Sequence, residues 1–269
     1  MKLFEREQTA HEYFKHSYKI PAPKPTLPLA DENFLSKWFA AAQAADTVEF
    51  LSSLFARHLN LRGIIKISFT QTLAGKLPVV DTDNHDDFST LAAYLMNREK
   101  KDLPLTVNAF TIPAQTASDA HRIILLNRAE YSMVNAEKMG LAASEWLEKS
   151  HKLRLRHEAA HYETLRIFGG MKNHALDEII ADTLGQIAAF GNFSAERQRL
   201  FFGLHGDKCD GRLQFYCKKV MENERHLVYN AVDKFLPTVE EEINSALSQK
   251  LSDEEILYKL VGCEIGENI

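Results

Sequence analysis

Cysteine is scarce in this chain, whose 269 residues contain three, Cys209, Cys217 and Cys263. An odd number without C-x-x-C spacing favours neither a disulfide framework nor a zinc knuckle, so we expect a reducing compartment. Long apolar runs are also missing, since no segment approaches the roughly 18 apolar residues that a membrane-spanning helix needs. The charged start, MKLFEREQTAHEYFKH, lacks the apolar stretch of a signal peptide. These absences predict a soluble, cytoplasmic protein without a membrane partner.

An excess of basic residues is absent as well. The formal net charge is -5, so the chain as a whole has no positive electrostatic field. Attraction of nucleic-acid phosphates needs clustered lysine and arginine. Nucleic acid is therefore not an expected partner. Hydrophobic residues make up 45% of the chain, which is enough to bury a sizeable core in one large domain or in two lobes. The oligomeric state stays open.

The first part of the chain combines a proline-rich stretch with a mixture of helix and strand patterns. Residues 20–29, IPAPKPTLPL, favour an extended path, so residues 1–30 are predicted to form an N-terminal arm that covers the body, reaches a second subunit or floats. Helical spacing follows in DENFLSKWFAAAQAAD and TVEFLSSLFARHL. The runs IIKISFTQT, LTVNAFTI and HRIILLN predict three strands around one helix at FSTLAAYLMNRE.

Strand patterns almost vanish after Asn135, and amphipathic stretches such as RHLVYNAVDKFL continue to the end. We therefore predict an α+β, mostly helical fold. Residues 31–135 should form an α/β lobe with a small mixed or antiparallel sheet. Residues 136–269 should form a helical lobe, and this lobe carries the one segment whose residues indicate chemistry.

That segment is RHEAAHYETLRIFGGMKNHALDEIIAD, residues 156–182. His157 and His161 are four positions apart, so their imidazoles project from nearly the same face of a helix and can bind one cation. Glu158 lies about 100° around the helix from His157, where a general base acting on metal-bound water belongs. A solvated helix face of mixed charge is the alternative interpretation, and a third ligand decides between the two.

A short turn should bring a second helix beside the histidines. Gly169 and Gly170 should end the first helix, and Asn173 is a good N-cap for the next. The two helices are then antiparallel neighbours. Small residues on one face of the second helix would let the helices approach closely, and they are Ala181, Gly185 and Ala189.

Counting from the turn predicts the third ligand. At about 1.5 Å per residue, His161 and His157 lie roughly 10 Å and 17 Å from the turn, while Glu178 and Asp182 lie roughly 7 Å and 13 Å along the second helix. Glu178 is then near the level of His161, and Asp182 lies between the histidines. Buried carboxylates need a cation or a histidine, and one zinc with two imidazoles would satisfy both.

At these residues, HEAAH followed by EIIAD, the sequence resembles the gluzincin (thermolysin-like) group of zinc metallopeptidases over about 26 residues. The resemblance implies a zincin-like fold with Glu158 as general base. It also implies that Asp182 hydrogen-bonds the outer nitrogen of His157, while Asp177 could do the same for His161. The zinc ligands that it implies are His157, His161 and Glu178.

Two features depart from that group. The interval between His161 and Glu178 is 16 residues, slightly fewer than usual in the group, and Asp177 stands where the group has asparagine. The resemblance further implies a downstream histidine or tyrosine that stabilises the oxyanion. The sequence offers four without ranking them, His205, Tyr216, His226 and Tyr229.

The leading hypothesis is a zinc-dependent metallohydrolase, a peptidase that uses metal-activated water on a peptide or other amide substrate. HRIILLN, upstream of the histidines, could offer a strand edge to that peptide. The alternative is a non-catalytic helical binding protein in which a structural metal, with a fourth ligand such as His174, joins the two helices. A di-iron site is less favoured, because the second E-x-x-H, Glu148 to His151, lies on the same helix.

The stretch DTDNHDD, residues 81–87, looks like the start of a calcium-binding loop. Asp86 stands where such a loop needs glycine, and Ala92 stands where it needs glutamate. We therefore predict that this stretch caps the helix that follows it.

Overall fold

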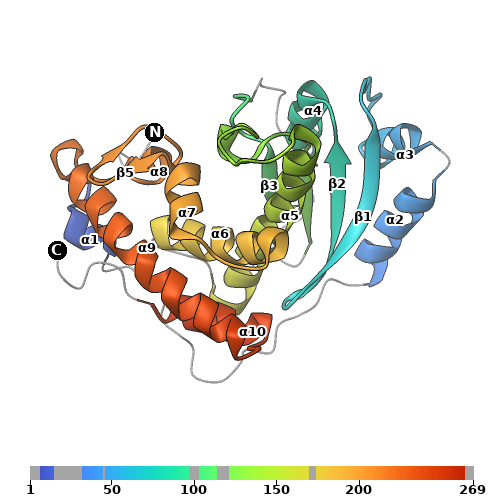
Figure 1. The fold of residues 1–269 in the computed structure, drawn as a ribbon. Helices are drawn as coiled ribbons and strands as arrows, with labels where there is room; N and C mark the ends of the chain where they lie inside the picture. Colours follow the sequence, from blue (N-terminus) through green and yellow to red (C-terminus); the bar gives the residue numbers. More distant parts are fainter. Residues whose placement is uncertain are drawn as a thin grey trace.

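The computed structural model describes residues 7–14, 32–44, 46–96, 103–113, 121–169 and 174–263. A sheet with its covering helices forms one half, and a group of helices forms the other (Figure 1). The sheet lies in the N-terminal half of the chain and the helices dominate the C-terminal half, which confirms the predicted α+β, mostly helical class. Within the described residues, no helix has the length and apolar character needed to cross a bilayer.

The sheet has four strands in the order β1-β2-β4-β3. β2 runs antiparallel to β1 and parallel to β4, and β3 runs antiparallel to β4, so the sheet is mixed. β4 is therefore an interior strand, and β1 and β3 are the edges. The strand bounds are β1 Ile65–Thr72, β2 Gly75–Thr82, β3 Ala109–Pro113 and β4 Arg122–Asn127.

Three of these strands are the predicted ones, and β2 is the strand that the sequence pattern does not indicate. Pro78 lies inside β2, and proline normally argues against an interior strand because it cannot donate to the ladder. The register explains the exception. β4 pairs with β2 only from Val79 onward, so Pro78 precedes the part of β2 that is paired on both sides.

Helices cover both faces of the sheet. One face packs against α2 Glu32–Gln43, α3 Thr47–Leu54 and α4 His85–Leu95 through a core that includes Trp38, Leu51 and Phe88. α2 and α3 fall within predicted helical segments, and α4 overlaps the predicted helix FSTLAAYLMNRE but begins three residues earlier, at His85. The side chain of Asn84 accepts hydrogen bonds from the backbone of Asp86 and Asp87 at the start of α4. The prediction that residues 81–87 cap a helix is therefore confirmed.

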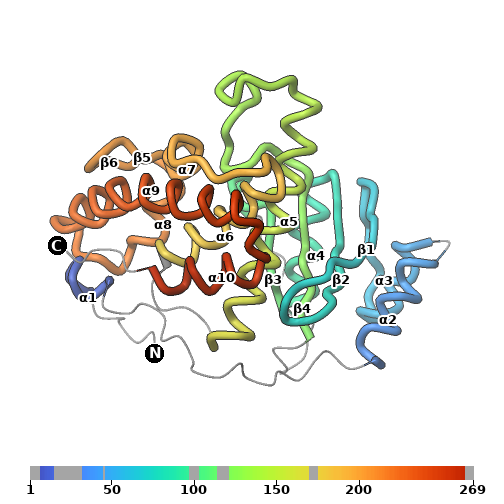
Figure 2. The backbone as a smooth tube through the Cα atoms, turned by 60° about the horizontal axis from the view of Figure 1, so that its bottom comes forward, coloured from blue at the N-terminus to red at the C-terminus, as the bar shows by residue number. Residues whose placement is uncertain are grey.

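The opposite face packs against α5 Ala143–Phe168, which carries both histidines and also contacts α6 His174–Phe190. Figure 2 shows α9 and α10 next to each other, and their buried side chains share a core with those of α6. The remaining elements are η1 Tyr131–Met133, α7 Ala195–Phe202, β5 Leu204–His205, β6 Lys208–Cys209, α8 Leu213–Tyr216, η2 Glu222–Glu224, α9 Arg225–Ser248 and α10 Asp253–Val261.

Part of the predicted N-terminal arm lies on the helical half. α1 Ala10–Phe14 is buried there, and the hydroxyl of Tyr13 accepts a hydrogen bond of 2.8 Å from the backbone N–H of Ala175 in α6. The backbone N–H of Ala10 donates to Glu224 at 2.8 Å. The proline-rich residues 20–29 lie outside the described residues.

The end of α5 and its packing against α6 agree with the sequence prediction. Gly169 ends α5 in the left-handed conformation, with φ of 75°. α6 begins at His174, although the predicted cap, Asn173, lies outside the described residues. At Gly185 an added Cβ would lie 2.8 Å from the carbonyl oxygen of Leu153 in α5. The two helices are therefore in close contact at this glycine.

The substitution Gly185→Ala tests this contact, because the sign of its effect on stability depends on whether α5 lies close to Gly185. In a helix without such a neighbour, replacing glycine by alanine stabilises by about 1 kcal/mol. Because the new methyl group would meet the Leu153 carbonyl, we expect Gly185→Ala to destabilise the protein by about 1–3 kcal/mol. Urea unfolding measures the difference, and a rise in stability would contradict the close approach of α5 and α6.

Candidate metal site

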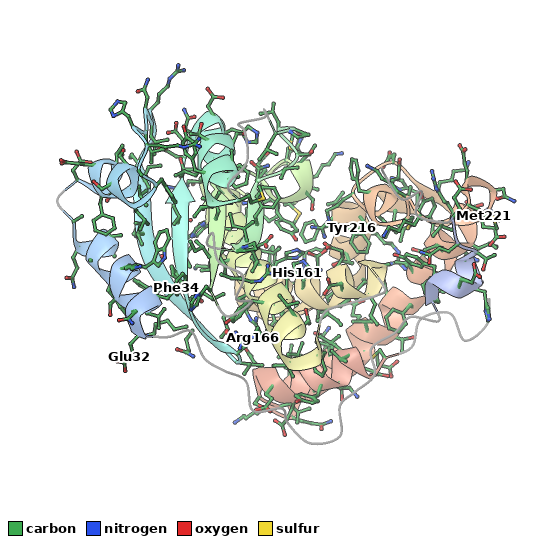
Figure 3. The ribbon with its side chains drawn as sticks, turned by 180° about the vertical axis from the view of Figure 1, so that it is seen from behind. Glu32, Phe34, His161, Arg166, Tyr216 and Met221 are labelled. Carbon is green, nitrogen blue, oxygen red and sulfur yellow. The ribbon has the colours of Figure 1, made fainter. Side chains whose placement is uncertain are left out.

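His157 and His161 of α5 meet Glu178 of α6 in one cluster, and their ligand atoms lie within 4.8 Å of one another. The two Nε2 atoms are 3.0 Å apart. Glu178 approaches both imidazoles, with Oε2 at 3.6 Å from His157 Nε2 and Oε1 at 3.4 Å from His161 Nε2. Figure 3 labels His161 on α5, at the boundary between the sheet and the helical half.

Two further carboxylates contact the outer nitrogens of the same imidazoles. Asp182 Oδ1 lies 2.8 Å from His157 Nδ1, and Asp177 Oδ1 lies 3.3 Å from His161 Nδ1. A carboxylate accepts hydrogen bonds, so each Nδ1 must supply the proton. Each Nε2 is then left with a lone pair that points into the cluster, which is the tautomer that a metal requires.

The cluster therefore brings together lone pairs that need a positive charge. Glu178 Oε2 is buried and has no hydrogen-bond partner among the described residues. Burial alone would lower the pKa of His161, but Asp177 and Glu178 raise it well above its ordinary value. Burial alone would raise the pKa of Glu178, yet His161, followed by His157 and Arg212, holds it at about 2. These residues fit a divalent cation, and a proton on His161 would compete with that cation.

Competition between a proton and a metal for His161 makes the metal affinity depend on pH. Because its pKa is raised, His161 keeps its second proton to higher pH than an ordinary histidine does, and a metal must displace that proton to bind. We therefore expect metal affinity to increase with pH until His161 is deprotonated without metal, and proton release to accompany binding. Calorimetry in buffers of different ionisation enthalpy measures the protons released, and binding without proton release would contradict the arrangement.

Asp182 connects the cluster to residues that the sequence motif does not include. It is fully buried and accepts from Gln198 Nε2 at 2.6 Å, and Arg212 and the hydroxyl of Tyr131 also hydrogen-bond to it. Burial alone would raise the pKa of Asp182, but the charge of Arg212 and the hydrogen bond with His157 hold it far below its ordinary value. Asp182 is thus an ionised acceptor that keeps the proton on His157 Nδ1.

A family model matches residues 111–267, and its description is "Family of unknown function (DUF7005)". The chain belongs to this family. Because the match begins on β3 and continues through α5 and α6, it contains His157, His161 and Glu178. No curated protein and no solved structure matches the chain.

Glu158 lies in the DUF7005 segment but outside the cluster of ligand atoms. Its carboxylate is buried and faces the sheet, where Oε2 accepts a hydrogen bond of 2.9 Å from Thr111 of β3. The same hydroxyl lies 2.7 Å from the backbone carbonyl oxygen of Glu158. The sequence does not indicate Thr111, because this contact joins residues 47 positions apart.

The four candidates for stabilising an oxyanion lie in different surroundings. Burial, followed by the charge of Glu178, raises the pKa of Tyr216 well above its ordinary value, which places Tyr216 beside the cluster. Figure 3 labels Tyr216 on the helical side of His161. Tyr229 belongs to the helical core, and His205 and His226 are exposed.

The second E-x-x-H pair, Glu148 and His151, does not join the cluster. Glu148 contacts Lys152 at 3.0 Å on the surface of α5, and His151 lies 3.5 Å from Asp81 of the sheet. The side chain of His174, a candidate fourth ligand, lies outside the described residues. The conjecture that HRIILLN offers a strand edge is wrong, because β4 is paired with β2 on one side and β3 on the other.

Proposed function

We propose that the protein is a zinc-dependent metallohydrolase, and specifically a peptidase of the gluzincin kind. The convergence of two imidazole Nε2 atoms and a buried carboxylate, one oxygen of which has no hydrogen-bond partner in the part of the chain that the structure describes, carries the proposal. The resemblance of HEAAH and EIIAD to the gluzincin motifs assigns the same residues as ligands. Two nitrogens and one oxygen are a donor set that suits zinc at an open catalytic site.

The metal would be held by His157, His161 and Glu178. When bound, it supplies a Lewis acid that polarises an amide carbonyl and lowers the pKa of a water molecule. Asp182 and Asp177 fix the tautomer and orientation of the two imidazoles from outside. The protein thus provides both the ligands and the residues that orient them.

Glu158 is the proposed general base. It follows His157 directly on α5, and its carboxylate is oriented by Thr111 rather than by a cation. In this position Glu158 accepts the proton of the attacking water and returns it to the leaving amine. Its burial limits competition from bulk solvent.

The position of β3 at an edge of the sheet favours an extended peptide as the substrate. β3 is an edge strand, and no described strand pairs with its outer side. Because Asn127 N–H donates to the carbonyl of Asn108, the alternation of an antiparallel ladder directs the N–H and C=O groups of Ala109 and Thr111 outward. The Thr111 carbonyl accepts from Arg122 Nη1 at 3.0 Å, so a peptide would pair with the other three groups. A peptide that added a strand there would lie beside Thr111, whose side chain contacts Glu158.

A defined peptide pool tests this function. The purified protein is incubated with the pool, and cleavage products are read by mass spectrometry with and without a zinc chelator. We expect cleavage that the chelator abolishes and added zinc restores. A protein that binds zinc but cleaves no peptide would contradict the peptidase proposal and favour a non-catalytic binding protein with a structural metal.

A further inference from the structure

Residues 128–134, the first part of the connection between β4 and α5, are fixed to α5 along their length. Arg154 donates to the carbonyls of Ala129 and Glu130, each at 3.0 Å. The backbone N–H of Tyr131 donates to Ser150 at 3.1 Å, and the indole of Trp146 donates to the carbonyl of Val134 at 2.6 Å. A segment held at so many points presents its side chains in one place.

This segment also has an unusual backbone. Ser132 and Met133 are consecutive residues with φ of 52° and 60°. Residues other than glycine and asparagine rarely adopt this backbone conformation. Met133 is exposed, and the hydroxyl of Ser132 is buried without a hydrogen-bond partner among the described residues. Strain of this kind persists where surrounding contacts determine the conformation, and it is concentrated near functional sites.

The side chain that this strained segment places is Tyr131. Its hydroxyl lies 3.0 Å from His157 Nδ1 and also hydrogen-bonds to Asp182 Oδ1. Arg212 Nη1 donates to the same hydroxyl oxygen at 2.8 Å. His157, its hydrogen-bond partner Asp182, and Arg212 therefore all contact one tyrosine oxygen.

Counting protons assigns the direction of each bond. The Tyr131 hydroxyl has one proton, and it donates that proton to ionised Asp182, which can only accept, while its oxygen accepts from Arg212. His157 Nδ1 must then supply its own proton, so its Nε2 keeps the lone pair that faces His161. If Tyr131 instead donated to Nδ1, neutral His157 would carry its own proton on Nε2, and Nε2 would have no lone pair for a metal.

We propose that Tyr131 is a positioning residue for the metal ligand His157. Its hydroxyl holds Asp182 and the imidazole in one arrangement, and the fixed segment 128–134 holds the hydroxyl. The inference rests on the metal centre proposed above. It adds a residue that lies upstream of the HEAAH motif and takes no part in binding the metal directly.

Zinc affinity of single tyrosine variants tests the inference. Tyr131→Phe removes only the hydroxyl, and we expect it to weaken zinc binding by about 10-fold in a competition titration with a chromogenic chelator. Tyr162→Phe is the matched control. Tyr162 is another buried tyrosine, next to His161 on α5, and its hydroxyl accepts from Arg166 at 2.8 Å instead. The control should bind zinc as the wild type does.

A double-mutant cycle with Asp182→Asn separates positioning from a general loss of stability. Because Tyr131 acts through Asp182 and His157, its effect should largely disappear in the Asp182→Asn background, whereas independent effects would add. Equal affinity of wild type and Tyr131→Phe would overturn the inference and leave the metal site intact. Additive losses, or an equal loss in Tyr162→Phe, would also overturn it. A wild type that binds no zinc would overturn the proposed function itself.

Discussion

His161→Ala should reduce the zinc content from about one atom per chain to almost none, since an open zinc site depends on three protein ligands. His161 supplies one of the two Nε2 atoms, which are 3.0 Å apart. Without it, His157 and Glu178 cannot complete the set. Elemental analysis after purification without chelator measures the loss.

His151→Ala is the matched control for that experiment. His151 lies on the same helix, but its imidazole lies 3.5 Å from Asp81 and outside the ligand cluster. The control should keep the zinc content of the wild type. Zinc content that is unchanged in His161→Ala, or equally reduced in both variants, would contradict the assigned ligands.

Glu158→Gln should separate metal binding from chemistry. Glutamine preserves the size of the side chain and can still accept a hydrogen bond from Thr111, but it cannot act as a base. We expect zinc content and thermal stability to remain near wild type while peptide cleavage falls by at least about 100-fold. Cleavage rates on a peptide identified from the pool give the comparison.

Glu148→Gln controls for the loss of one carboxylate from α5. Glu148 lies on the surface, where it contacts Lys152, so its replacement should leave cleavage unchanged. Persistent cleavage by Glu158→Gln would show that Glu158 is not the base. If the substitution instead removed zinc, Glu158 would be a ligand, and the structural-metal and di-iron alternatives would gain support.

Local spacing explains why the candidate cluster could be predicted from the sequence. The interval from His157 to His161 fixes their common face on any helix, and the rise per residue from the glycine turn sets the level of Glu178. The structure brings these three residues together and places Asp182 at His157 Nδ1. Each of these relations depends on regular helices joined by a short turn.

The contacts around the cluster depend instead on how distant segments pack. Tyr131, Thr111 and Arg212 reach the site from three other parts of the chain, and no fixed interval relates them to the histidines. The strand β2 also depends on pairing with a distant segment. Pro78 is acceptable in it only because pairing with β4 begins at Val79. The order of the strands likewise makes β3, and not β4, an edge.

The central claim is that His157, His161 and Glu178 hold one zinc ion between α5 and α6. Anomalous diffraction from crystals of the zinc-loaded protein, recorded on both sides of the zinc absorption edge, tests it most directly. The predicted result is a single strong peak, about 2.0–2.2 Å from both Nε2 atoms and from a carboxylate oxygen of Glu178. No peak among these three side chains, or a zinc ion bound elsewhere on the chain, would contradict the claim.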